Sequence, residues 1–465
     1  FRLLAHQLTE LHAGQGSGNL ERMAQATAQV LSTGENTGPV VVGHDRRFMA
    51  ATHADRVAAV LAGNGLRVLR VNQPAPTPAI SGLVVDEAAR AGIVITASHN
   101  PPHYSGFKIK SEQGASAAPS VTDAIQSHLD EKSPILVPVA EARKSDLWET
   151  VEFRSGYLKR LARRVDRDII GSAAPLTIVV DSMHGCGDDL IAAFLASTCH
   201  RVITLRATRD PLFGGAGPEP IPQRLKILRQ AVLEHGADLG IATDGDADRL
   251  AAVDERGEFL SALQITPLLA DYLIRDRGER GTLARTCANT IVLDRMATAH
   301  RLPFKVFPIG FKYLVPLLVK GELLLGGEES GGIGVAGYLP ERDGLLMGLL
   351  LVEMRAAGSL SISQRLSNLR RLYGEFHYRR LDLPVSPAHG RALAQRLAAA
   401  PPAGLAGIKV TGVDQMDGTK LLLGEAGWVM LRPSGTEPVL RLYCEARTTQ
   451  EVNSILEEIT TWARS

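Results

Sequence analysis

Three segments of the chain repeat one pattern, in which a short run of β-branched apolar residues ends at or near an aspartate. The runs lie at 39–45, 176–181 and 290–294, and each predicts a buried strand followed by a loop. A helical stretch and a second short strand follow each run. We expect these elements at 54–61 and 67–71, at 190–196 and 201–205, and at 296–301 and 304–307. The alternation predicts βαβ units and largely parallel sheets.

Each repeat continues through another helix into a third strand that ends in a polar loop. The helices are expected at 80–91, 225–235 and 313–319. The loops read TASHNP at 96–101, DGDADR at 244–249 and GEESGG at 327–332. Ligands of open α/β sheets bind beyond the carboxyl ends of the strands, so the three loops are expected to open onto one crevice.

The last segment, from about residue 373, departs from this order. Strand-like pieces at 428–431 and 439–444 and a helix at 451–462 predict a smaller α+β domain. A chain of 465 residues is too long for one hydrophobic core. We therefore predict four domains, and their expected bounds are 1–150, 151–256, 257–372 and 373–465.

Composition narrows the class of protein. Apolar residues make up 45% and charged residues 22%, as in ordinary globular proteins. Lys and Arg number 51 against 50 for Asp and Glu, so no overall positive field attracts nucleic acid or an anionic membrane. The apolar run at 345–352 is too short to span a bilayer and predicts a buried helix. The four cysteines lack disulfide or zinc spacing, which favours reduced thiols and a cytoplasmic location.

The loop at 244–249, which we call the acidic loop, carries aspartates at alternate positions, Asp244, Asp246 and Asp248. Gly245 allows a tight turn between them. Oxygen-rich ligand sets of this kind suit Mg²⁺ better than Zn²⁺. The alternative is an acidic surface turn. An EF-hand is not indicated, because the loop lacks the remaining calcium ligands of that motif. Arg249 beside the aspartates is free to hold a phosphate.

The loop at 96–101, which we call the serine loop, follows an apolar strand. Two prolines stiffen the turn and expose the Ser98 hydroxyl. A serine in such a place is usually only a turn residue. Lys108 lies ten positions later, and it is a candidate proton acceptor or donor if its pKa is lowered by desolvation or by neighbouring cations.

Two further loops offer groups for a phosphosugar. The loop at 432–438 combines Arg432 with two hydroxyls and a glycine, and Arg441 follows on the next strand, which together suit a dianionic phosphate. Glu328 and Ser330 offer acceptor and donor groups for sugar hydroxyls. Taken singly, each loop also fits an ordinary glycine-containing surface turn.

In this order, the four loops resemble those of the α-D-phosphohexomutase superfamily, and more narrowly its bacterial phosphoglucomutase-like members. The resemblance runs from about Val40 to the C-terminus. It implies an α/β protein with three related α/β domains, mixed and largely parallel sheets, and a C-terminal α+β domain around a central cleft. By this resemblance the domain at 1–150 bears a phosphoserine. The domains at 151–256, 257–372 and 373–465 then bind metal, sugar and phosphate, respectively.

The resemblance also implies roles for individual residues. Ser98 is expected to carry the phosphoryl group and to hold Mg²⁺ together with Asp244, Asp246 and Asp248. The implied catalytic residues are Ser98, Lys108, Arg47 and His99. The implied substrate-binding residues are Arg249, Gly310, Lys312, Glu328, Ser330, Arg432, Ser434, Gly435, Thr436 and Arg441. The implied reaction interconverts hexose 1-phosphate and hexose 6-phosphate through a hexose 1,6-bisphosphate. The enzyme is expected to be a monomer or weak homo-oligomer that binds a small phosphosugar and neither nucleic acid nor membrane.

Two departures from the family pattern and the last residue of the loop at 327–332 leave alternatives open. The usual opening strand of the family is not recognisable after Phe1, and Tyr338 stands where similar enzymes often have His. Gly332 favours glucose, because phosphomannomutase-like relatives often carry His there, and a phosphomannomutase or a bifunctional mutase is the alternative. A catalytically silent phosphosugar-binding protein and a net phosphatase are more distant alternatives.

Overall fold

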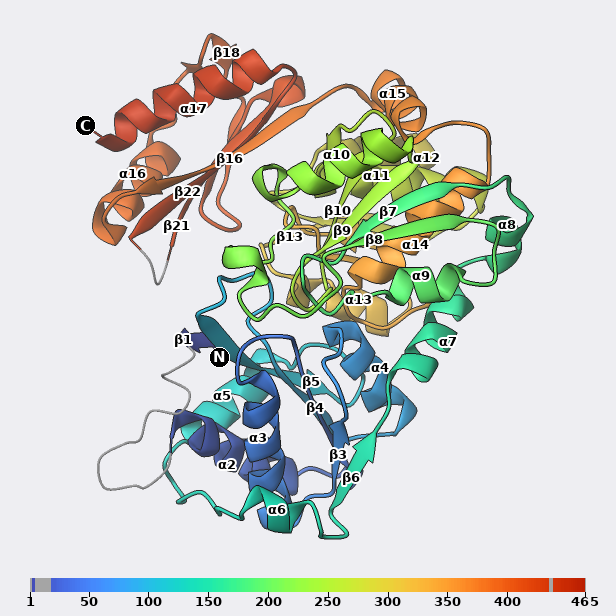
Figure 1. Cartoon of the computed structure of the whole chain (residues 1–465). Coiled ribbons are helices and arrows are strands. Elements are labelled where there is room, and N and C mark those ends of the chain that lie inside the picture. Colours follow the sequence, from blue (N-terminus) through green and yellow to red (C-terminus); the bar gives the residue numbers. More distant parts are fainter. Residues whose placement is uncertain (1, 5–17, 435–437, 465) are drawn as a thin grey trace. The chain divides into compact units, whose positions relative to one another are not determined.

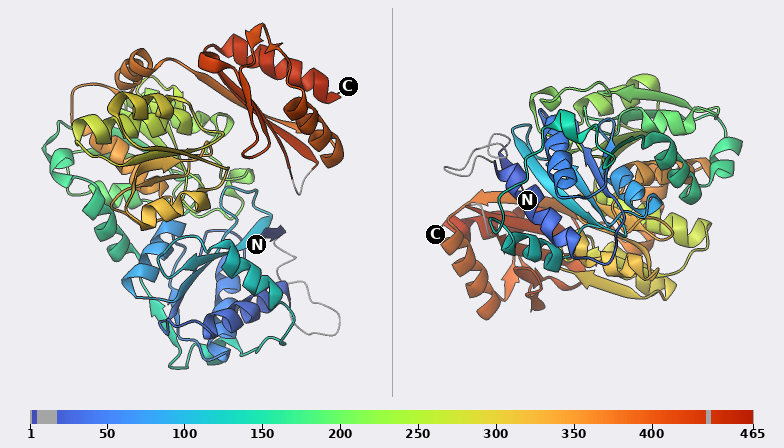
Figure 2. Two further views of the ribbon diagram at one scale, coloured as in Figure 1. Left: turned by 180° about the vertical axis from the view of Figure 1, so that it is seen from behind. Right: turned by 90° about the horizontal axis from the view of Figure 1, so that it is seen from below.

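A computed structural model describes residues 2–4, 18–434 and 438–464 (Figures 1 and 2). The chain divides into two compact units. The first unit comprises Phe1–Ala262, Val315–Glu322 and Ser330–Ser363. The second unit comprises Leu263–Leu314, Leu323–Glu329 and Gln364–Ser465. Three mixed or parallel sheets flanked by helices, together with a C-terminal domain, give the α/β class that the sequence predicted.

The first sheet of the first unit has six strands in the order β1-β5-β4-β2-β3-β6. Their bounds are β1 Arg2–Leu4, β2 Val40–His44, β3 Val68–Val71, β4 Ala91–Ile95, β5 Tyr104–Ser111 and β6 Trp148–Val151. Strands β4, β2, β3 and β6 are parallel, and β5 runs antiparallel to β4. The opening residues do supply an edge strand, because β1 pairs with β5.

Helices cover both faces of this sheet. Alternate residues of β2 and β4 pack with α2 and α3 in one hydrophobic core, while α4 contacts the same strands from the other face, where Ile80 lies against Gly43. The helices of this region are α2 Asn19–Ser32, α3 Ala50–Gly63, α4 Thr77–Asp86, α5 Pro119–Ser127 and α6 Val139–Ala142. The prediction placed α4 at 80–91. The helix begins earlier because Thr77 and Pro78 form its first turn, where proline is tolerated.

The second sheet of the first unit has the order β11-β10-β9-β7-β8. Its strands are β7 Thr177–Asp181, β8 Arg201–Leu205, β9 Leu239–Thr243, β10 Leu250–Asp254 and β11 Phe259–Leu260. The other elements of the first unit after β6 are α7 Arg154–Arg164, α8 Arg167–Ser172, α9 Leu190–Leu195, η1 Phe213–Gly215, η2 Pro222–Arg224, α10 Lys226–His235, α13 Val315–Val319, β15 Ile333–Val335 and α14 Gly344–Ala356. The apolar run at 345–352 is the buried helix that the sequence predicted, and Gly348 lets it approach Ile241 of β9.

In the second unit, strands β13, β12 and β14 are parallel, and their bounds are β12 Thr282–Thr286, β13 Phe304–Phe307 and β14 Leu323–Gly327. The predicted strand at 290–294 was wrong. The Thr290 hydroxyl accepts a hydrogen bond from the Val292 N–H (3.1 Å), and helix α12 Val292–His300 begins there. The true strand was overlooked because it contains Arg285, whose guanidinium pairs with Asp294 (2.7 Å) and breaks the apolar pattern.

The C-terminal sheet is antiparallel in the order β16-β22-β21-β20-β19. The remaining elements are α11 Ala262–Asp271, η3 Tyr272–Asp276, η4 Phe311–Tyr313, α15 Ile362–Tyr373, β16 His377–Pro384, α16 Pro387–Ala399, β17 Gly404–Leu405, β18 Ile408–Lys409, β19 Gly412–Asp414, β20 Thr419–Leu422, η5 Gly424–Ala426, β21 Gly427–Pro433, β22 Val439–Ala446 and α17 Thr449–Arg464. All four cysteines are free thiols. In the part of the chain that the structure describes, every helix is too short or too polar to cross a bilayer.

Two buried histidines should make the stability of the protein depend on pH. Burial, with Arg70 nearby, lowers the pKa of His44 to about 4, and burial, with Arg56 nearby, lowers the pKa of His53 to about 4. Both rings are therefore neutral in the folded protein near neutral pH, whereas they gain a proton in the unfolded chain below about pH 6.5. The free energy of unfolding should fall by about 1.4 kcal/mol per pH unit for each ring as pH falls from about 6.5 toward 4.

Urea unfolding at about pH 7 and about pH 5 tests this expectation. His53→Leu should reduce the difference between the two urea midpoints, because one of the two rings no longer takes up a proton. Val57→Ala, one turn further along α3, should lower both midpoints by a similar amount and leave their difference unchanged. An undiminished pH dependence in His53→Leu would contradict the assignment.

Candidate active site

The serine loop leaves the carboxyl end of β4 in a strained conformation. Ser98 has a φ of 52°, which is the left-handed region that residues other than glycine seldom adopt. Its N–H donates to the Thr96 hydroxyl (2.9 Å), which itself donates to the Asp45 carboxylate (2.7 Å). These bonds hold the turn in place, and strain retained in this way is common at functional sites.

Arg47 organises the same loop from the end of β2. The five hydrogen bonds of its guanidinium group go to the Asp45 carboxylate (3.0 Å) and to four carbonyl groups, three in the serine loop and one at the start of β5. Those carbonyls belong to Ser98 (2.6 Å), Asn100 (2.7 Å), Pro101 (2.8 Å) and Tyr104 (3.0 Å). The N–H groups of this buried side chain therefore donate to other parts of the protein.

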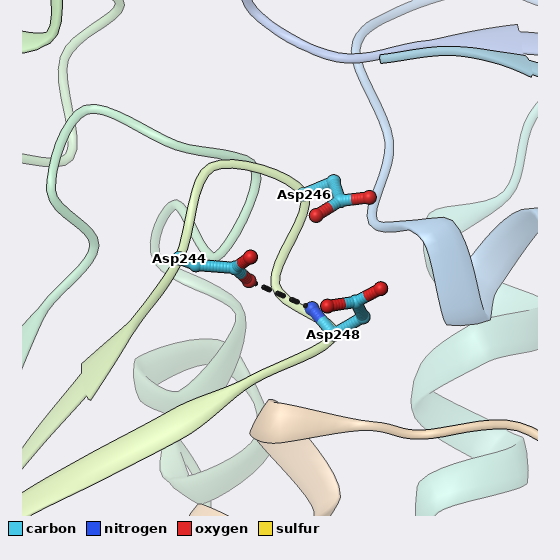
Figure 3. Close-up of side chains that lie close together, drawn as sticks. All are labelled: Asp244, Asp246 and Asp248. Carbon is cyan, nitrogen blue, oxygen red and sulfur yellow. Dashed lines mark hydrogen bonds between the residues drawn. The ribbon is translucent and has the colours of Figure 1, made fainter. Parts of the chain in front are cut away.

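The acidic loop at the carboxyl end of β9 brings three carboxylates together (Figure 3). Asp244, Asp246 and Asp248 are fully buried, and ligand atoms from the three lie within 4.8 Å of one another. The turn is closed by the N–H groups of Asp248 (3.0 Å) and Arg249 (3.1 Å), which donate to the Asp244 carboxylate. Gly245 is required here because a Cβ atom would lie 2.7 Å from the carbonyl oxygen of Ser98.

The two loops meet directly. The Ser98 hydroxyl donates to the Asp244 carboxylate at 2.7 Å. Lys108 of β5 donates to Asp246 (2.6 Å) and Asp248 (3.2 Å), and Arg249 lies 3.9 Å from Asp248. The first unit therefore gathers residues from β2, β4, β5 and β9 at one place, although they lie far apart in the sequence.

Electrostatics at this place separate the roles of the ionisable groups. Burial, reinforced by its two acidic neighbours, raises the pKa of Asp244 well above its usual value. Burial also opposes ionisation of Asp248, but Arg342, Lys108 and Arg249 outweigh it and lower the pKa of that carboxyl.

Lys108 and His99 differ from the expectation for proton carriers. Burial lowers the pKa of Lys108, but the carboxylates of Asp246 and Asp248 outweigh it, so the pKa is raised and the ammonium stays protonated. The sequence argument required a lowered pKa for a basic role. Burial, with Arg249 nearby, lowers the pKa of His99 to about 2, so its ring is neutral near neutral pH.

The donor set fits a hard divalent cation. Oδ1 of Asp246 and Oδ1 of Asp248 are buried and accept no hydrogen bond from the described residues. Ionised carboxylate oxygens without donors, gathered on one side of a tight turn, are suited to Mg²⁺. No zinc-like set of His and Cys ligands accompanies them among the described residues.

The remaining predicted residues lie on several loops. Ser330 belongs to the first unit, where its hydroxyl is buried without a hydrogen bond from the described residues and the next residue, Gly331, accepts a bond from the Leu250 N–H (3.1 Å). Glu328 is buried at the end of β14 in the second unit. A single crevice that unites these loops stays a prediction.

The second unit also carries the predicted phosphate cradle. Arg432 of β21 lies directly opposite Arg441 of β22 in the strand register. Asp417 accepts from Arg432 Nε (2.9 Å) and from the N–H of Ile309 (2.9 Å), which joins the cradle to the loop of Gly310. Lys312 of that loop lies over the Tyr313 ring, Ser434 is buried after β21, and Gly435 and Thr436 lie outside the described residues.

Tyr338, which stands where similar enzymes often have histidine, is part of a hydrogen-bond network around Asp343. Its hydroxyl donates to Asp343 (2.8 Å), which also accepts from the Tyr157 hydroxyl (2.9 Å) and from the N–H of Leu346 (3.0 Å) at the start of α14. Burial raises the pKa of Asp343 to about 6. The tyrosine hydroxyl is thus committed to a buried network under the acidic loop.

Three residues with close contacts in the candidate site were missed by sequence reasoning. Thr77 donates to Asp246 (2.6 Å), Arg342 donates to Asp248 (2.6 Å), and Asp417 holds Arg432. The Thr-Pro pair was a readable signal for a helix start, but nothing in the sequence connected it with an acidic loop 169 positions away. Arg342 and Asp417 gave no separate signal.

Comparison with known proteins agrees with the α/β fold described above. Four family profiles match the chain, and all describe phosphoglucomutase/phosphomannomutase: α/β/α domain I at residues 14–135, α/β/α domain II at 155–257, α/β/α domain III at 263–373 and the C-terminal domain at 393–461. They cover most of the chain and follow its order.

Individual relatives are similar over nearly their whole length. A phosphoglucomutase/phosphomannomutase of Thermococcus kodakarensis is 32% identical over 422 residues, which cover 90% of this chain and 88% of the relative. A phosphoglucosamine mutase of Mycobacterium marinum is 31% identical over 444 residues, which cover 94% and 93%. The crystal structure of a putative phosphomannomutase from Thermus thermophilus is 33% identical with a TM-score of 0.87 and covers 100% of this chain and 98% of that one.

Fold, site and relatives together define a mutase-type isomerase that acts as an intramolecular phosphotransferase. The chain belongs to the phosphoglucomutase/phosphomannomutase family of phosphohexomutases.

Proposed function

We propose that the protein interconverts hexose 1-phosphate and hexose 6-phosphate through a phosphoserine at Ser98. The observation that carries this proposal is the 2.7 Å hydrogen bond between the Ser98 hydroxyl and Asp244, since it places a nucleophilic oxygen on a buried triad of acids. The phosphorylated serine donates its phosphoryl group to the free hydroxyl of the substrate. The resulting hexose 1,6-bisphosphate turns around and returns its other phosphoryl group to Ser98.

Asp244, Asp246 and Asp248 would hold Mg²⁺ together with the serine. A Mg²⁺ held there would neutralise charge on the peripheral phosphoryl oxygens, which carry most of the charge in the loose transition state of phosphoryl transfer. Lys108 and Arg249 add two cations beside the triad. Protonated Lys108 suits charge stabilisation and proton donation to a departing oxygen, while neutral His99 is a poor proton acceptor at neutral pH.

The second unit supplies groups for the phosphate that does not react. Arg432 and Arg441 lie directly opposite each other in the sheet, and guanidinium groups bind phosphate oxygens through pairs of N–H donors, which supports a dianionic phosphate at this place. Ser434, Gly435 and Thr436 complete the proposed cradle. Glu328, Ser330, Gly310 and Lys312 are the proposed contacts to the sugar.

Glucose is the proposed sugar because the loop at 327–332 ends in Gly332, which offers no bulky donor for the C2 hydroxyl of the sugar. A phosphomannomutase or a bifunctional mutase is the second candidate, since relatives bear phosphomannomutase names, and glucosamine 1-phosphate follows from the mycobacterial relative. The choice among these sugars changes the substrate and leaves the chemistry unchanged.

An isomerisation assay with glucose, mannose and glucosamine 1-phosphates, primed with glucose 1,6-bisphosphate, tests the proposal. We expect fastest turnover with glucose 1-phosphate, loss of turnover after EDTA treatment, recovery with Mg²⁺, and one phosphoryl group on the intact protein. Faster turnover of another sugar would overturn only the glucose assignment. No turnover and no bound phosphoryl group would favour a silent phosphosugar-binding protein, and release of inorganic phosphate beyond isomerised sugar would favour a phosphatase.

A further inference from the structure

Thr77, the first residue of α4, contacts Asp246 at two points. Its hydroxyl donates to Oδ2 of the Asp246 carboxylate (2.6 Å), and its N–H donates to the Asp246 carbonyl oxygen (2.9 Å). Thr77 is fully buried. The two bonds connect the first sheet of the first unit, which carries the serine loop, with the acidic loop of the second sheet.

The helix start explains why this N–H is available. The first N–H groups of a helix have no partner within the helix, and the preceding residue, Pro76, provides no side-chain cap. The carbonyl oxygen of Asp246 satisfies the N–H of Thr77 instead. A β-branched side chain has few rotamers in a helix, so the hydroxyl is aimed at the carboxylate with little loss of freedom.

The donors around the acids are distributed unequally. Lys108 joins Thr77 on Oδ2 of Asp246 (2.6 Å), whereas Oδ1 is buried and accepts no hydrogen bond from the described residues. Asp248 repeats the pattern, because Lys108 (3.2 Å) and Arg342 (2.6 Å) both donate to its Oδ2, and its Oδ1 likewise accepts none. In both aspartates, one carboxylate oxygen accepts hydrogen bonds from the protein, and the other is left for a metal ion.

We propose that Thr77 is a positioning residue for the metal site: its hydroxyl fixes the rotation of the Asp246 carboxylate so that Oδ1 faces the cation. The inference rests on the proposed Mg²⁺ site. Partners of metal ligands fix the orientation of those ligands, and losing one typically weakens metal binding by about 10- to 100-fold. Because Thr77 belongs to the serine-bearing part of the first unit, it also sets the position of the acidic loop relative to Ser98.

The test compares Mg²⁺ affinity, measured by titration calorimetry, among variants of α4. Thr77→Val has nearly the same shape but no hydroxyl, so its Mg²⁺ dissociation constant should rise by about 10- to 100-fold. Thr77→Ser keeps the hydroxyl and should stay within about threefold of the wild type. Both variants keep the backbone bond to Asp246. Ser81→Ala is the matched control, since Ser81 is buried one turn further along α4 with a hydroxyl that has no partner among the described residues.

Thermal unfolding of the metal-free proteins separates positioning from structural support. An unchanged dissociation constant in Thr77→Val, with a lower melting temperature, would overturn the inference and leave Thr77 a structural residue. Thr77→Ala also removes the hydroxyl, and it decides the question if the valine variant does not fold. Absence of Mg²⁺ binding by the wild-type protein would instead overturn the proposed metal site, and this inference with it.

Discussion

Replacing Ser98 with alanine should lower turnover by about 10⁴-fold or more, the scale of loss seen when an enzyme loses its nucleophile. The hydroxyl lies 2.7 Å from Asp244, and the proposed reaction passes every phosphoryl group through that oxygen. The variant should also lack the phosphoryl group that intact-mass measurement detects on the wild-type protein. Its fold should remain, because alanine loses only the contact with Asp244.

Ser105→Ala provides the matched control for this experiment. Ser105 is also buried, in β5 of the same sheet, and its hydroxyl has no hydrogen-bond partner among the described residues. Turnover and phosphorylation should both survive that substitution. Retained turnover in Ser98→Ala, or a phosphoryl group still present at the wild-type level, would place the reacting oxygen elsewhere.

Predictions from sequence succeeded where the local pattern decides the structure. The strands before the serine and acidic loops are mostly apolar, and β4 and β9 end at Ile95 and Thr243, directly before the loops expected at 96–101 and 244–249. Each loop carries its own chemistry in consecutive residues. The meeting of Ser98 with the acids was also expected, because both loops lie at the carboxyl ends of strands, where ligands of α/β proteins bind, although the two strands belong to different sheets.

Contacts between distant segments are the part that sequence did not supply. Thr77 lies 169 positions from Asp246, and Asp417 accepts from Ile309, which lies 108 positions away, as well as from Arg432. A lone threonine or aspartate has no distinguishing neighbours in the sequence. Strand β12 was missed for the opposite reason. Arg285 interrupts its apolar pattern, and the ion pair with Asp294 that allows burial of the arginine is visible only in the folded chain.

The direction of the Lys108 pKa was also beyond sequence reasoning. Desolvation alone predicts a lowered pKa. The outcome depends on where two carboxylates from another loop come to lie, and at 2.6 and 3.2 Å they reverse the sign. Proximity to a serine loop therefore gives no guide to whether a lysine serves as a base or as a fixed positive charge.

Replacing Arg47 with methionine should produce the second large loss, through the conformation of the serine loop. Four carbonyl oxygens, including that of Ser98, lose their donor, and the carboxylate of Asp45 stays buried without its cation. Breaking a buried ion pair of this kind costs about 3–5 kcal/mol of unfolding free energy. Displacing a reacting group by about 1 Å costs about 100-fold in rate. Arg47→Lys keeps the charge but not the planar fork, so it should recover only part of either loss.

The kinetic constants decide how Arg47 acts. Its guanidinium is already committed to the protein, so we expect kcat to fall while KM for the hexose phosphate changes little. Arg46→Met is the control, because Arg46 contacts Asp188 and the Ala207 carbonyl rather than the serine loop, and its effect on kcat should be much smaller. A rise in KM with unchanged kcat in Arg47→Met would mean that this arginine binds the substrate directly. A fall in kcat, together with poor phosphorylation of Ser98, would mean that the enzyme uses one buried cation to hold its nucleophile in a strained turn.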